Sequence, residues 1–122
     1  MKILIIDDES DIRQIANLGL SRVGRMEVVE AGSGFEGIEL ALSEAPDCIL
    51  LDVMMPQMDG PTTLARLRAM PQTAAIPVIF LTAKAMTPEL KGLMETGAAG
   101  VLTKPFDPLT LANEVRGILG AT

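Results

Sequence analysis

Short apolar runs alternate along this chain with longer stretches in which apolar residues recur every three or four positions. The short runs predict strands, and the longer stretches predict amphipathic helices. The candidate strands are residues 2–6, 26–29, 48–51, 77–81 and 99–102. A helical pattern follows each of them. This alternation predicts an α/β domain in which a parallel sheet of five strands lies between helix layers and is joined by right-handed crossovers.

Polar residues, glycine and proline mark the ends of the first three helices. The first helix begins after the first strand and ends at Gly24, a residue that tolerates a positive φ at a helix C-terminus. Ser33-Gly-Phe-Glu36 is a capping box that opens a helix through Leu42. Asp59-Gly60-Pro61 supplies an N-cap and a first-turn proline for a helix that reaches about Met70.

The last two helices have similar boundary signals. Thr87-Pro88 repeats the cap and proline, and Gly97 closes that helix. Asp107-Pro108 opens the final helix. Its predicted apolar face consists of Leu109, Leu111, Ala112, Val115, Ile118 and Leu119.

The central strand carries the first hint of chemistry. Residues 48–51 are apolar throughout, which is typical of a parallel strand buried on both faces. Asp52 follows directly, and Pro56 lies just beyond it. Ligands of open α/β sheets bind outside the carboxyl ends of the strands, so Asp52 is placed for chemistry. The alternative is that Asp52 only begins the loop after the strand.

Composition narrows the function classes. The 122 residues fit one domain, residues 1–122, and the net charge of −6 without Lys/Arg clusters argues against direct nucleic-acid binding. No apolar run reaches the length of about 18 residues that a membrane span needs, and the N-terminus turns acidic too early for a signal peptide. The single cysteine, Cys48, fits a small buried hydrophobe in a reducing compartment. We therefore expect a soluble cytoplasmic protein.

The chain contains no histidine. This excludes a Ser-His-Asp or Cys-His catalytic arrangement and any histidine-ligated metal site within the chain. A metal ion bound here would have oxygen ligands.

Five polar residues follow the predicted strands at the same edge of the sheet. Asp7 and Asp8 follow the first strand, Asp52 the third, Thr82 the fourth and Lys104 the fifth. Each residue alone is a weak signal, since loops are polar anyway. Their convergence on one edge predicts a functional site.

The predicted site has the chemistry of phosphoryl transfer. Three neighbouring carboxylates repel one another unless a cation joins them, and Mg²⁺ prefers such oxygen ligands, with the backbone carbonyl of Met54 as a further candidate. A carboxylate beside a metal ion and a lysine is a nucleophile toward phosphorus. Mg²⁺ and Lys104 would neutralise the transferring group, and Thr82 would donate a hydrogen bond to it. Asp52 is the predicted acceptor, because it alone comes from the central strand. In the alternative interpretation, Lys104 only balances the charge of an acid.

The chain resembles a receiver domain of a two-component response regulator, of the single-domain kind found among chemotaxis regulators. The matching motifs are Ile5-Ile-Asp-Asp-Glu9, Leu50-Leu-Asp-Val-Met-Met-Pro56 with Met58-Asp-Gly60, Leu81-Thr-Ala83 and Leu102-Thr-Lys-Pro-Phe106. The resemblance implies a doubly wound, flavodoxin-like (βα)5 fold with strand order 2-1-3-4-5. It also implies that the phosphoryl donor is a histidine on a sensor histidine kinase or a histidine phosphotransfer protein.

The resemblance implies a role for each site residue. Asp52 corresponds to the phosphoacceptor, Asp7 and Asp8 to the pair that binds Mg²⁺, Thr82 to the switch hydroxyl and Lys104 to the lysine that contacts the phosphoryl group. Lys104-Pro105 corresponds to a cis peptide bond of the family. Such a domain is not an enzyme for external substrates, although it promotes its own phosphorylation and dephosphorylation.

One position departs from the family pattern. Val101 lies three residues before the lysine, where the family usually has Tyr or Phe. A valine is too small to follow the threonine inward as the aromatic ring does. The sequence therefore predicts the chemistry of the family but leaves the output switch open.

Two other functions compete with this interpretation. An aspartate-nucleophile phosphohydrolase commonly has a second Asp two residues after the nucleophile, where this chain has Met54. A phosphorylation-independent adaptor would keep the fold without the chemistry. The output partner is unknown; the expected contact surface is the fourth helix with the fifth strand and helix, or the first helix near Ile12 and Arg13. We expect a monomer or a weak dimer.

Overall fold

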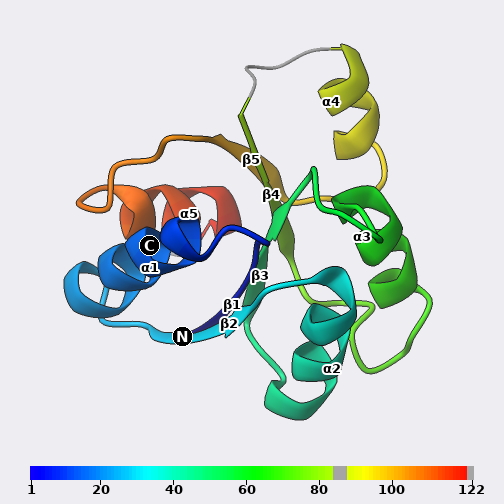
Figure 1. Ribbon diagram of the computed structural model, residues 1–122, viewed down its shortest axis with the longest axis horizontal. Helices are drawn as coiled ribbons and strands as arrows, with labels where there is room; N and C mark the ends of the chain where they lie inside the picture. Colours follow the sequence, from blue (N-terminus) through cyan, green and yellow to red (C-terminus); the bar gives the residue numbers. More distant parts are fainter. Residues whose placement is uncertain (84–87, 121–122) are drawn as a thin grey trace.

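The computed structural model describes residues 1–83 and 88–120. Within them the strands are β1 (Lys2–Ile6), β2 (Glu27–Ala31), β3 (Cys48–Asp52), β4 (Val78–Thr82) and β5 (Gly100–Thr103). All pair in parallel in one sheet of order β2-β1-β3-β4-β5 (Figure 1). The predicted α/β class and strand order are confirmed.

Helices lie on both faces of the sheet. They are α1 (Ser10–Leu18), which continues as the π-helix η1 (Gly19–Val23), then α2 (Gly34–Glu44), α3 (Gly60–Arg68), α4 (Pro88–Met94) and α5 (Leu111–Leu119). Figure 1 shows α1 and α5 on one side of the sheet and α2 and α3 on the other. Among the described residues, no helix is long and apolar enough to cross a membrane.

Alternate residues of each strand pack into opposite core layers. Ile3 and Ile5 of β1 contact the layer under α1, η1 and α5, whereas Leu4 and Ile6 contact the layer under α2 and α3. All four side chains are fully buried. Burying each such side chain contributes about 1.5–3 kcal/mol. Because a shift of one residue would exchange the two layers, this packing fixes where each strand ends and therefore where the polar residues after it lie.

Two predicted helix caps are confirmed. The Ser33 hydroxyl accepts a hydrogen bond from the Glu36 N–H at 3.1 Å, and the Glu36 carboxylate accepts one from the Gly32 N–H at 2.7 Å. Asp59 accepts a hydrogen bond from the Thr62 N–H at 2.9 Å. The helices end at Glu44 and Arg68, two residues later and two residues earlier than the sequence predicts.

Gly24 ends the first helical segment as predicted, but without using the positive φ that glycine tolerates. Gly24 has φ −84°, and the left-handed residue is Arg25, with φ 57°. Glycine is required at position 24 for space, because a Cβ atom there would lie 2.4 Å from the Ala112 Cβ of α5. The local sequence carries no sign of this contact between distant helices.

Three predictions concern the later helices. Gly97 has φ 101°, as expected of a glycine that closes a helix, whereas the predicted Thr87 cap lies outside the described residues. Asp107 does not open α5 directly: its carboxylate accepts the Leu109 N–H at 2.8 Å in a turn that precedes Leu111. Leu109 is 69% exposed in that turn, so its predicted place on the apolar face is wrong. The rest of that face is confirmed, because Leu111, Ala112 and Val115 are buried and Ile118 and Leu119 pack against the same core layer.

Candidate functional site

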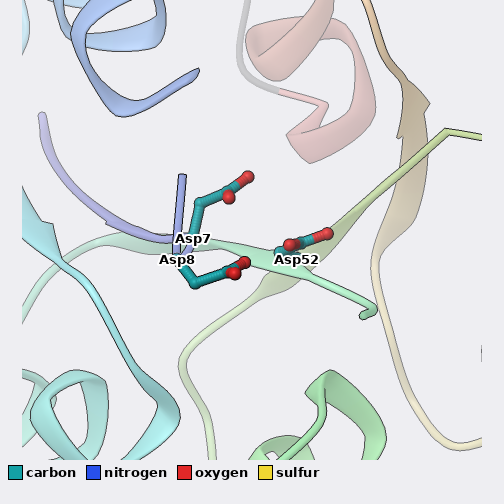
Figure 2. Close-up of side chains that lie close together, drawn as sticks. All are labelled: Asp7, Asp8 and Asp52. Atoms are coloured by element: carbon teal, nitrogen blue, oxygen red, sulfur yellow. The ribbon is translucent and has the colours of Figure 1, made fainter. Parts of the chain in front are cut away.

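Three carboxylates meet where β1 and β3 end. These strands are neighbours, with Ile6 paired to Leu51, so the residues that follow, Asp7 and Asp52, lie side by side. Oxygen atoms of Asp7, Asp8 and Asp52 lie within 4.8 Å of one another (Figure 2). Asp7 and Asp52 are buried, whereas Asp8 is exposed. Two of the three carboxylates are therefore buried, and the cluster is open to solvent on the side of Asp8.

Lys104 lies between the two buried acids. Its Nζ is 2.7 Å from Asp7 Oδ2 and 3.2 Å from Asp52 Oδ1, and its side chain is only 11% exposed. Burial alone would lower the pKa of Lys104, but the two carboxylates outweigh it and raise that pKa. The ammonium therefore stays charged. The Lys104-Pro105 bond is cis, as the resemblance implies.

The environment of Asp52 raises the pKa of its carboxyl to about 6. Burial is the main cause and the neighbouring Asp7 charge is the second, while Lys104 and the Met54 N–H act in the opposite direction. One lysine therefore does not compensate fully for two buried carboxylates and the exposed one beside them. The excess negative charge favours a further cation at this point.

The donor set fits an oxygen-preferring divalent ion. Three carboxylates converge without any nitrogen or sulfur ligand among them. The buried Asp7 Oδ2 contacts the Lys104 ammonium, and no further donor among residues 1–83 and 88–120 reaches it. The exposed side at Asp8 leaves room for the waters and phosphoryl oxygens that complete such a coordination sphere.

The loop after β3 packs closely against Asp52. The Gly60 N–H donates to the Val53 carbonyl at 2.9 Å, and a Cβ on Gly60 would lie 2.3 Å from the Asp52 carbonyl oxygen. Gln57, in the same loop, has φ 70°. The sequence places Gly60 at the start of a helix and in the motif Met58-Asp-Gly60 but does not predict this contact, because nothing local indicates how near the strand comes.

The remaining predicted site residues lie on the neighbouring strands and the loop. Thr82 ends β4, next to β3, and is 7% exposed. Its carbonyl accepts the Lys104 N–H at 2.7 Å, which ties together two of the predicted residues. The Met54 side chain is 80% exposed. Val101 is half-buried and packs against the layer under α2 and α3.

The chain is thus a doubly wound α/β domain with acids and a lysine gathered at the carboxyl edge of its parallel sheet. Residues 3–116 match the model of the response regulator receiver domain. The chain therefore belongs to the receiver domain family of two-component response regulators, whose function is phosphoacceptor signalling.

Solved structures support this assignment. The chain is similar to the chemotaxis protein CheY4 of Vibrio cholerae, with a TM-score of 0.88 and 35% identity over 96% of this chain and 97% of that one. It is also similar to a putative response regulator of Chloroflexus aurantiacus, with a TM-score of 0.87 and 34% identity over 98% and 97% of the two chains. Both cover nearly the whole fold.

Curated relatives are longer. The chain is 40% identical over 99% of its length to the DNA-binding dual master transcriptional regulator RpaA of Synechocystis, of which it covers 50%. It is equally similar to the transcriptional regulatory protein SrrA of Staphylococcus aureus, of which it covers 48%. The chain thus spans about half the length of these relatives.

Proposed function

We propose that residues 1–122 form one cytoplasmic receiver domain in which Asp52 is the phosphoacceptor. The observation that carries this assignment is the place of Lys104, whose Nζ lies 3.2 Å from Asp52 Oδ1 and 2.7 Å from Asp7 Oδ2, with all three side chains largely buried. Asp52 is the acid at the end of the central strand. Asp7 and Asp8 lie together after β1 and are suited to share an ion instead.

In this proposal Mg²⁺ is bound by Asp7, Asp8, Asp52 and the backbone carbonyl of Met54. When bound, the ion would offset negative charge on the transferring phosphoryl group. Lys104 would supply a second positive charge, fixed in place by its two carboxylate contacts. The Thr82 hydroxyl is proposed to donate a hydrogen bond to a phosphoryl oxygen.

The transfer step uses a phosphohistidine on a sensor histidine kinase or a histidine phosphotransfer protein. A carboxylate oxygen of Asp52 forms a bond to phosphorus while the P–N bond breaks. The electron pair of that bond returns to the imidazole nitrogen of the partner, which takes up a proton from water. The same site promotes loss of the phosphoryl group to water, so the domain controls its own phosphorylated state without acting on external substrates.

Phosphorylation changes charge locally before it changes partner binding. It adds about −1.5 to −2 charges and strong acceptor oxygens beside Thr82 and Lys104. Because the Lys104 N–H is bonded to the Thr82 carbonyl, a movement of β4 is passed to β5. We propose that an output partner then binds to one of two surfaces, either that of α4, β5 and α5 or that of α1. The domain itself is proposed to be a monomer or a weak dimer. Val101 of β5 is half-buried and lacks the ring usual at this position in the family.

The alternatives make different predictions for one experiment. The chain is mixed with a small acyl phosphate and Mg²⁺, and its mass and the released phosphate are followed. We expect one added phosphoryl group per chain, and none after Asp52→Asn. Steady release of phosphate over many turnovers would favour a phosphohydrolase, against which Met54 argues. No mass increase in the unmodified chain would favour a phosphorylation-independent adaptor.

A further inference from the structure

The guanidinium of Arg13 reaches from α1 to the backbone of the acidic turn. Its Nη1 donates a hydrogen bond to the Asp7 carbonyl oxygen at 2.8 Å, and its Nε donates one to Glu30 Oε1 of β2 at 3.2 Å. The Arg13 side chain is 21% exposed. One side chain thus joins a helix, an edge strand and the end of β1 next to the metal site.

Glu30 holds Arg13 in this orientation. Its Oε1 accepts the bond from Arg13, and its Oε2 accepts a second bond from Asn17 Nδ2 at 2.8 Å. Both residues that contact Glu30 come from α1, so the carboxylate is fixed against that helix. The planar donor group of an arginine matches two acceptors at once, which a lysine ammonium on a flexible chain does less well. The charge of Arg13 is also compensated by Glu30.

Besides the contact of its Oδ2 with Lys104, Asp7 is held by three hydrogen bonds. Its N–H donates to the Ala31 carbonyl at 3.1 Å, and its Oδ1 accepts from the Glu9 N–H at 2.9 Å. Arg13 supplies the third contact, on the Asp7 carbonyl. That carbonyl belongs to the peptide group that joins Asp7 to Asp8. The Arg13 bond therefore restrains the peptide plane between the two acids.

We propose that Arg13 is a positioning residue for the divalent ion: it fixes the peptide plane that orients the Asp7 and Asp8 carboxylates toward Asp52. The described hydrogen bonds of its side chain are with Asp7 and Glu30, so it acts through the acidic turn. This inference rests on the proposed function, since it concerns the same ion. It gives Arg13 a role inside the domain, distinct from contact with a partner.

Charge and position predict opposite effects when Arg13 is replaced. A cation near an acidic cluster repels Mg²⁺, so by charge alone its removal would tighten Mg²⁺ binding. If Arg13 positions the acids, its removal weakens binding, because the peptide between Asp7 and Asp8 loses its restraint. Groups that orient metal ligands typically change metal affinity by about tenfold or more when they are removed.

The test is a MgCl₂ titration of the 122-residue chain and its variants, followed by the backbone amide NMR signals of residues near the site. We expect Arg13→Met to weaken Mg²⁺ binding by about tenfold and to shift the Asp8 amide signal before any Mg²⁺ is added. Arg13→Lys keeps the charge and restores part of the affinity. Arg22→Met, at an exposed position of η1, removes the same charge and leaves the affinity equal or slightly tighter.

The outcomes separate the two proposals. If the unmodified chain binds Mg²⁺ and Arg13→Met binds it as tightly or more tightly, the positioning role is overturned and the proposed function stands. If the unmodified chain does not bind Mg²⁺ at all, both are overturned. Should Arg13→Met not fold, Arg13→Lys decides: an affinity equal to that of the unmodified chain contradicts the proposal, because the lost geometry would then have no effect.

Discussion

The two edges of the sheet carry similar charged residues in different settings. At the carboxyl edge, Lys104 contacts Asp7 and Asp52, and all three side chains are nearly or fully buried. At the amino edge, Lys2 lies 3.4 Å from both Glu27 and Glu44, whose side chains are 68% and 37% exposed. Water screens the second group and not the first. Lysine–carboxylate pairs therefore stabilise the fold weakly at the amino edge. At the carboxyl edge, the buried carboxylates leave a negative charge that one lysine does not compensate.

Removing the lysine at each edge gives the largest expected contrast. Lys104→Met leaves two buried carboxylates without their cation, and we expect it to lower the free energy of unfolding by about 3 kcal/mol at pH 7. Lys2→Met removes a half-buried cation whose partner carboxylates are exposed and screened by water, so we expect little change. Urea unfolding without Mg²⁺ measures both. Equal losses from the two variants would show that burial does not distinguish the edges.

The backbone around the site provides the next comparison. Gly60→Ala places a Cβ 2.3 Å from the Asp52 carbonyl, so the loop or the strand end must move. We expect a loss of about 2 kcal/mol in unfolding free energy. Gly117→Ala, in α5, meets nothing within 4 Å and is expected to stabilise by about 0.5–1 kcal/mol. Thermal unfolding of both variants measures these changes. If Gly60→Ala were as stable as Gly117→Ala, the close packing at Asp52 would be contradicted.

The raised pKa of Asp52 predicts how stability depends on pH. The pKa of Asp52 is about 6 in the folded chain, against an ordinary aspartate value of 3.8. Below both values the carboxyl is protonated in both states, so there is no penalty. As the pH rises through about 6, ionisation favours the unfolded state and stability without metal falls.

Asp52→Asn should remove this dependence. We expect it to raise the free energy of unfolding by about 1–2 kcal/mol at pH 7, and by much less at pH 4. Asp47→Asn at the amino edge is the matched control; its carboxylate accepts the Lys2 N–H at 2.7 Å, and the amide keeps an acceptor there. Unfolding curves at the two pH values test this. A gain at pH 7 no larger than at pH 4 would be incompatible with the pKa shift.

The sequence predicts the site better than it predicts the contacts that support it. Asp7, Asp8, Asp52, Thr82 and Lys104 are predictable because parallel strands end at one edge and the apolar runs show where they end. The contact of Gly24 with Ala112 and that of Gly60 with the Asp52 carbonyl are not. Each joins segments whose separation depends on packing, which no local pattern encodes. The hydrogen bond from Arg13 to the Asp7 carbonyl has the same origin.

Mg²⁺ should stabilise the folded chain through the carboxylates at the carboxyl edge of the sheet and not through those at the amino edge. A ligand that binds only the folded state adds about 1 kcal/mol to its stability at five times the dissociation constant. We expect this gain in the unmodified chain and in Lys2→Met, and its loss on addition of EDTA. Asp52→Asn removes a ligand and the excess charge together, so its gain should be much smaller. An equal gain in Asp52→Asn would place the ion away from the buried carboxylates. The excess negative charge at Asp52 would then not be compensated by this ion.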